Sequence, residues 1–182
     1  MKRLIITALL LLFSIPADAG EMLGSPAPDF TLADLRTGEL VSLSDYKSQI
    51  VVLQIWRACK GKCRAAVPHF KRLQSEFPSD LSGTSTAVGE QSKPALKILS
   101  VNAIDFKKAI ASEAKKLGMD YQILVGRKSR ITRLYKTIVL PQVYIIDPSG
   151  IIRHVTMYPD YDELRNMIDE LYTEFAEADS GH

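Results

Sequence analysis

One short segment constrains the fold more than any other part of the sequence. Residues 50–56 form a nearly continuous apolar run rich in β-branched side chains, ending in Trp56. Such a run is typical of a strand that is buried on both faces of a mostly parallel sheet. We therefore expect an α/β domain in which 50–56 is the central strand.

The segments around this strand alternate between strand and helix patterns. A hairpin is expected first, from 25–32 and 39–43 around the turn Thr37-Gly38. After it, the helix that begins near Cys63 contains Pro68, which removes a backbone donor and predicts a kink. A strand at 96–101 is expected next, followed by a helix that is capped by Asp105 and has Phe106, Ile110, Ala114 and Leu117 on one face. The chain then continues with a strand at 122–125, a short helix at 131–135 and a hairpin of 143–147 and 151–156. The last helix carries on one stripe the apolar residues Leu164, Met167, Ile168, Leu171, Tyr172 and Phe175. Residues 79–94 are expected to form an exposed loop.

The first residues have the pattern of a cleaved secretory signal. Lys2 and Arg3 precede an apolar stretch, 4–15, which is followed by the small-residue sequence 17–20. The apolar stretch is shorter than the roughly 17–25 residues of a membrane-spanning helix. We expect cleavage after Ala19, which makes 1–19 a signal peptide and 20–178 one domain, located in the periplasm or secreted.

The charge balance says little about partners. Loss of Lys2, Arg3 and Asp18 with the signal lowers the formal charge from +2 to about +1, which gives no reason to expect a nucleic-acid partner.

Chemistry is expected at the two cysteines of the chain, Cys59 and Cys63, which lie between the central strand and the next helix. A thiolate near a helix N-terminus is stabilised by unpaired backbone N–H groups, so Cys59 should be acidic and nucleophilic. The basic neighbours Arg57, Lys60, Lys62 and Arg64 act in the same direction. Cys63, about one turn further along, suits the resolving role.

Several motifs in order resemble the exported thioredoxin-like family that includes TlpA and ResA, of the AhpC/TSA redoxin type. They are Ala27-Pro28-Asp29-Phe30, the strand ending in Trp56, Cys63-Arg64 with Pro68 after it, and Leu140-Pro141. The resemblance implies a thioredoxin-like fold, with a central mixed sheet flanked by helices and an N-terminal β-hairpin extension. It also implies thiol–disulfide exchange through Cys59 and Cys63. No cofactor is predicted.

The same resemblance suggests the surroundings of the thiols and the partners. A cis-proline at Pro141 would shape the substrate groove, and Trp56 would line that groove or cover the core. The implied partners are exported thiol or disulfide proteins, apocytochrome c among them, and a membrane-embedded thiol reductant. We expect a monomer.

Two features depart from the family. Its members usually carry Cys-x-x-Cys, whereas this chain has Cys-x-x-x-Cys. In a regular helix, Cβ atoms four positions apart are about 5–6 Å from each other, but a disulfide requires about 3.5–4.5 Å, so a local distortion is expected, for which Gly61 can supply unusual dihedral angles. In addition, Gln54 stands where thioredoxins bury an aspartate, and it cannot titrate.

Three other interpretations remain open. The pair could form a structural disulfide, because exported proteins form bridges readily. Two thiolates one turn apart could instead bind Cu(I), as in Sco-type copper chaperones, although 137–141 lacks the histidine of that family. A peroxidase is disfavoured because 53–58 has neither the Pro nor the Thr or Ser expected before a peroxidatic cysteine. No metal site is predicted.

Overall fold

The computed structural model describes residues 22–58, 61–77 and 94–180, with side chains described as far as Phe175. The expected signal peptide, 1–19, lies outside the described residues, as do Cys59, Lys60 and residues 79–93 of the expected loop. Among the described residues, no helix combines the length and the apolar character that a membrane crossing requires.

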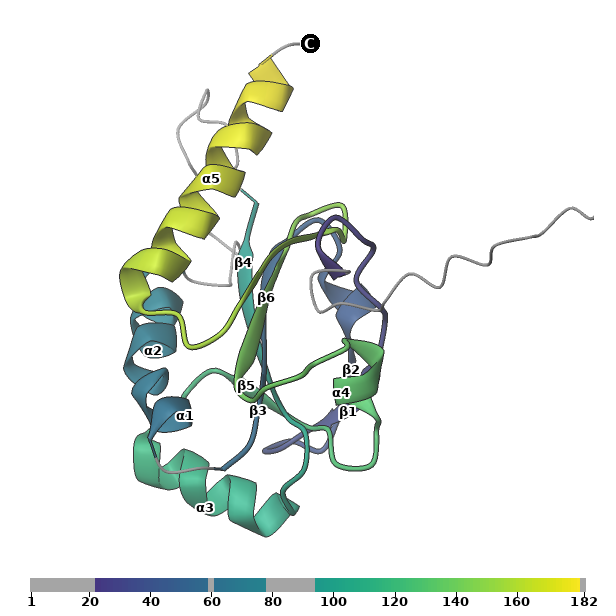
Figure 1. Ribbon diagram of the computed structural model, residues 1–182, viewed down its shortest axis with the longest axis vertical. Coiled ribbons are helices and arrows are strands. Elements are labelled where there is room, and N and C mark those ends of the chain that lie inside the picture. Colours follow the sequence, from purple (N-terminus) through teal and green to yellow (C-terminus); the bar gives the residue numbers. More distant parts are fainter. Residues whose placement is uncertain (1–21, 59–60, 78–93, 181–182) are drawn as a thin grey trace, which may run out of the picture.

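The architecture is a seven-stranded mixed sheet with helices on both faces (Figure 1). The strand order is β2-β1-β5-β4-β3-β6-β7, in which β3, β4 and β5 are parallel to one another and the other neighbours pair antiparallel. The strands are β1 (Thr31–Asp34), β2 (Leu40–Ser42), β3 (Ile50–Trp56), β4 (Leu96–Asn102), β5 (Gln122–Val125), β6 (Gln142–Ile146) and β7 (Ile152–Thr156).

The central strand is where the apolar run predicted it. Every residue of β3 is buried, since β4 and β6 pair with its two edges and helices cover both faces. The predicted N-terminal hairpin is also confirmed, but it is part of the sheet because Ala33 of β1 pairs with Val125 of β5.

The helices divide between the two faces of the sheet and close two apolar cores. The elements are η2 (Leu43–Tyr46), α1 (Lys62–Ala65), α2 (Val67–Glu76), α3 (Lys107–Leu117), α4 (Ile131–Leu134) and α5 (Tyr161–Ser180). Phe70, Ile110 and Leu164 fill the core under α2, α3 and α5. α4 lies on the opposite face of the sheet (Figure 1), where Ile131 and Tyr135 belong to the second core.

The predicted kink is confirmed as a break between α1 and α2 at Ala66. Pro68 has no N–H to donate, and the helix resumes with His69 and Phe70 donating their backbone N–H groups to the carbonyl of Ala66.

The prediction that Asp105 caps the next helix is wrong. Phe106 is the N-cap residue of α3, and its side chain is 65% exposed instead of lying on the buried face with Ile110 and Ala114. The carboxylate of Asp105 is directed elsewhere, because it accepts hydrogen bonds from Ala58 and Asn102.

Candidate thiol–disulfide site

Of the two predicted thiols, the structure describes Cys63, which lies where the strand β3 leads into the first helix. Cys63 is the second residue of α1, is 4% exposed and is disulfide-bonded. Cys59, the predicted nucleophile, lies outside the described residues. The side chain of Cys63 is therefore shielded from water, and its resolving role stays a prediction.

Gly61 permits the turn that leads into α1. Its φ is +92° and its ψ is −123°, a backbone conformation that L side chains rarely adopt. A Cβ at this position would meet no atom within 4 Å, so the backbone conformation alone requires glycine. The predicted unusual dihedral angles of Gly61 are therefore confirmed.

The segment before the cysteines is held by a carboxylate that the sequence did not identify. Asp105 Oδ2 accepts hydrogen bonds from the backbone N–H of Ala58 at 2.6 Å and from Asn102 Nδ2 at 2.9 Å. Asn102 is fully buried, and its Oδ1 accepts the backbone N–H of Asp105. Because β3 and β4 end side by side, a residue after β4 can fix the backbone after β3. The sequence signal is Asn102 followed three residues later by Asp105 at a strand end.

Trp56 is the last residue of β3 and is 3% exposed. It belongs to the core that contains Ala66 and Val67, and its Nε1 has no hydrogen-bond partner among the described residues. This position covers the core beneath the cysteine segment, and contact of Trp56 with a substrate stays a prediction.

Pro141 lies at the same edge of the sheet as Trp56. The Leu140–Pro141 peptide bond is cis, and the next residue, Gln142, pairs with Ile55 of β3. Pro141 is thus adjacent to the end of the strand from which the cysteine segment departs. The expected cis geometry is confirmed, and its role in substrate binding stays a prediction.

A hollow of about 540 Å³ lies beside this proline. Its lining is mostly apolar, from Leu23, Ile138, Val139, Val155 and Met157, with Gln142 as a polar member. Gln142 is 4% exposed, and its Oε1 has no hydrogen-bond partner within the described part of the chain. An apolar segment with a free N–H donor would match these features.

The charges near Cys63 are mainly positive. Arg57 and Lys62 are exposed, and Lys62 Nζ lies 4.0 Å from the centre of the Tyr158 ring. Arg64 is paired with Glu113, with Nε 2.5 Å from Oε1. Exposed cations favour the charged form of a nearby thiol, and the predicted acidity of Cys59 stays a prediction.

Gln54 is buried in β3, two residues before Trp56, and accepts a hydrogen bond from the hydroxyl of Ser100 at 3.0 Å. The amide thus fills the position with a satisfied, non-titrating group. Among the described residues, no group of three or more His, Cys, Asp or Glu side chains could hold a metal ion.

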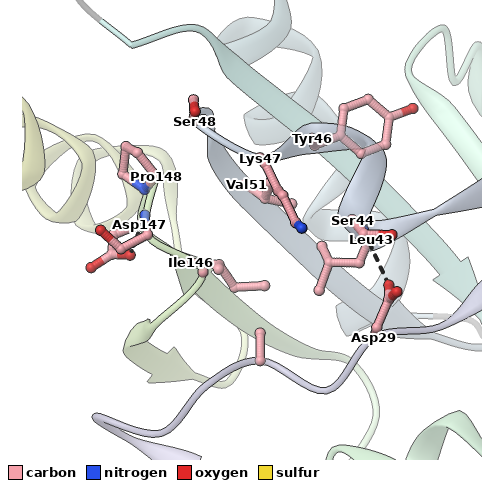
Figure 2. Close-up of a pocket in the computed structure, with 13 residues that line it drawn as sticks. Asp29, Leu43, Ser44, Tyr46, Lys47, Ser48, Val51, Ile146, Asp147 and Pro148 are labelled. Atoms are coloured by element: carbon pink, nitrogen blue, oxygen red, sulfur yellow. Dashed lines mark hydrogen bonds between the residues drawn. The ribbon is translucent and has the colours of Figure 1, made fainter.

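A second cavity, of about 470 Å³, lies at the other end of β3 (Figure 2). It is lined by Val51 at the start of the strand, by Lys47 and by Asp29, which accepts the backbone N–H of Ser44. Since Cys63 follows the opposite end of β3, this cavity is separate from the thiol site.

Comparison with known proteins agrees with the resemblance found in the motifs. The model of the AhpC/TSA family matches residues 23–155. A thiol-disulfide oxidoreductase ResA of Geobacillus kaustophilus is 27% identical over 132 residues, covering 72% of this chain and 67% of the relative. The thioredoxin-like protein YneN of Bacillus subtilis is 29% identical over 144 residues, covering 76% and 73%.

Solved structures support the fold. The thioredoxin domain of a thiol-disulfide oxidoreductase from Bacteroides vulgatus has a TM-score of 0.68 at 21% identity, covering 82% of this chain and 97% of that one. A putative thiol:disulfide interchange protein DsbE from Chlorobium tepidum has a TM-score of 0.69 at 22% identity, with the same coverage. The predicted thioredoxin-like fold is confirmed.

Proposed function

We propose that this chain, which belongs to the AhpC/TSA family, is an exported thiol–disulfide oxidoreductase that exchanges disulfides with protein partners through Cys59 and Cys63. The observation that carries the proposal is the disulfide-bonded Cys63 at the junction of β3 and α1, at the same edge of the sheet as the cis-proline Pro141. The chain has two cysteines, so the partner that we propose for Cys63 is Cys59.

In the reduced protein, the Cys59 thiolate attacks one sulfur of a partner disulfide. The partner's S–S bond breaks, a mixed disulfide forms, and the other partner sulfur leaves as a thiolate. Cys63, once deprotonated, then attacks the Cys59 sulfur, which releases the second partner thiolate and closes the Cys59–Cys63 bond. Two electrons pass to the partner. The oxidised protein runs the same steps in reverse with a partner dithiol.

The neighbouring residues would have distinct tasks in this reaction. Asp105 holds the backbone of Ala58, next to Cys59, through a 2.6 Å hydrogen bond. Pro141 and the apolar hollow beside it would receive the partner segment, and Trp56 supports the cysteine segment from below.

The proposal of export and of partners rests on the N-terminal sequence pattern and on the family resemblance. Cleavage after Ala19 would release the domain 20–178 to the periplasm or the medium as a monomer. Its substrates would be exported thiol or disulfide proteins, such as apocytochrome c, and a membrane-embedded thiol reductant would return the electrons.

A redox titration in defined glutathione buffers tests the proposal, with the Cys59–Cys63 pair followed by alkylation and mass shift. We expect a reversible transition above roughly −300 mV, the range of labile disulfides. Cys59→Ser should abolish exchange and leave folding intact. An inert pair whose loss unfolds the protein would indicate a structural disulfide, and a reduced pair that binds Cu(I) tightly would indicate a copper carrier.

A further inference from the structure

Basic side chains are concentrated in one segment between β5 and β6. Residues 121–146 contain no Asp or Glu, whereas ten consecutive positions, 127–136, contain five Lys or Arg. We call this set the basic rim: Arg127, Lys128, Arg130, Arg133 and Lys136. The total charge of the chain is close to zero and therefore does not reveal this local excess of positive charge.

The basic rim begins at the sheet edge that carries the thiol site. β3, β4 and β5 end in register, since Trp56 pairs with Asn102 and Asn102 with Val125. Backbone hydrogen bonds from Ala103 to Trp56 and from Gly126 to Asn102 connect the three ends. Two strand spacings place the start of the rim about 10 Å from the end of β3.

The rim is held on a rigid base. Ile131 and Tyr135 are buried in the core beneath α4, and the Tyr135 hydroxyl donates to the carbonyl of Pro28 at 2.7 Å. Lys128, Arg130 and Arg133 are exposed around these anchors. The guanidinium of Arg127 lies 3.6 Å from the centre of the Phe106 ring, at the exit of β4.

The backbone of the rim is unusual for its residue types. Lys128, Arg130 and Lys136 have φ values of +71°, +60° and +48°, where glycine or asparagine is ordinarily found. A lysine or arginine is strained in this conformation, because its Cβ approaches the following carbonyl oxygen. The sequence therefore places cations where the backbone favours other residues.

Four of the five cations of the rim take part in no ion pair within the described part of the chain. These four are Arg127, Lys128, Arg130 and Arg133. The acidic side chains of α5, including Asp162, Glu163 and Glu170, belong to a helix that covers the same face of the sheet as α1 and α2, whereas α4 of the rim covers the opposite face (Figure 1).

We propose that the partner polypeptide of the thiol site is acidic next to its reacting cysteine and that the basic rim binds its carboxylates. The inference rests on the proposed function. A standard interface covers about 800 Å² on each partner, a disc of about 16 Å radius, so a protein docked over the end of β3 also reaches the start of the rim. Cations at such a position attract acidic partners and accelerate their encounter.

The test compares three disulfide peptides of one length, flanked by Glu, by Gln or by Lys, in reaction with the reduced protein. At 10 mM salt we expect the Glu peptide to react at least about ten times faster than the Lys peptide. The difference should nearly disappear in 0.5 M salt, because screening shortens the range of the attraction. Equal rates for the three peptides would overturn the proposal.

Matched variants locate the effect. Lys128→Gln with Arg130→Gln should lower the rate for the Glu peptide about threefold or more and leave the Gln peptide unchanged. Lys115→Gln with Lys116→Gln, which removes the same charge from the exposed end of α3, should change the rate less than about twofold. Equal losses in the two variants would mean that total charge, and not the rim, is recognised.

Three further measurements separate this inference from the proposed function and from membrane binding. Exchange with oxidised dithiothreitol, which is neutral, reports the function alone. A thiol-free Glu peptide should shift the backbone amide resonances of 127–136 even if exchange is absent, and the absence of such shifts would refute the inference. Binding to phosphatidylglycerol vesicles that is lost in the rim variant, without any peptide preference, would show that the rim contacts membranes instead.

Discussion

Replacing Asp105 tests how the thiol site is held together. Its carboxylate accepts the Ala58 N–H at 2.6 Å and Asn102 Nδ2 at 2.9 Å. A hydrogen bond to a charged acceptor contributes about 1.5–3 kcal/mol, and the low end applies because Asp105 is partly exposed. Asp105→Ala should therefore lower the free energy of unfolding by about 3 kcal/mol, and Asp105→Asn, which keeps one acceptor, by about half of that.

Urea unfolding of the disulfide form at pH 7 measures these losses, with the exchange rate as a second readout. Asp120→Ala is the control, since its exposed carboxylate accepts no hydrogen bond from the described residues, and it should change stability by less than about 0.5 kcal/mol. We expect Asp105→Ala to slow exchange about tenfold or more, because Cys59 follows the released Ala58. A loss of stability below about 1 kcal/mol would refute the reasoning, because water would then replace the carboxylate without cost.

Three further predictions concern the scaffold. Burial raises the pKa of Asp34, but hydrogen bonds from Thr37, Arg36 and Gln122 outweigh it and hold the pKa below its usual value of 3.8. A carboxyl whose pKa is lowered by folding stabilises the protein at pH values above its unfolded-state pKa. Asp34→Asn should therefore lower the free energy of unfolding at pH 7, and lower it progressively less as the pH falls below about 4. A loss that does not change with pH in urea unfolding would contradict this. Gly61→Ala should cost about 1–3 kcal/mol by the same assay, because φ is +92° while the space is open, and an unchanged midpoint would show that the turn can relax. Tyr144→Phe should cost about 1 kcal/mol, because the hydroxyl donates to the carbonyl of Tyr135 at 2.7 Å, and no change in thermal unfolding would mean that water takes its place.

Periodicity and turn residues were sufficient to predict most of the fold. The run that ends in Trp56 identified the central strand because it is buried on both faces. The kink at Pro68 followed from its missing N–H, and the cis bond at Pro141 from the family resemblance. The strand and the kink are local properties, which depend on a residue and its immediate neighbours.

The predictions from the sequence were wrong where a side chain has a partner that is distant in the sequence. Asp105 has the residue type and position of a helix cap, but the free N–H of Ala58, 47 positions earlier in the chain, binds its carboxylate instead. Phe106 also has the spacing of a core residue, yet its ring lies outside, beneath the guanidinium of Arg127. Both outcomes depend on which strand ends lie side by side, and that is known only once the sheet order is known.

We assign different roles to the cations beside the cysteines and to the cations of the basic rim. Gln54 fills its buried position in β3 with an amide that does not titrate, while Asp105 at the sheet edge is engaged by two donors. Arg57 and Lys62 are exposed and flank the cysteine segment in the sequence, whereas the rim begins about 10 Å from the end of β3, one Debye length at 0.1 M salt. Neutralising the rim should therefore slow the encounter with acidic partners without changing the thiol pKa, and neutralising Arg57 and Lys62 should change both.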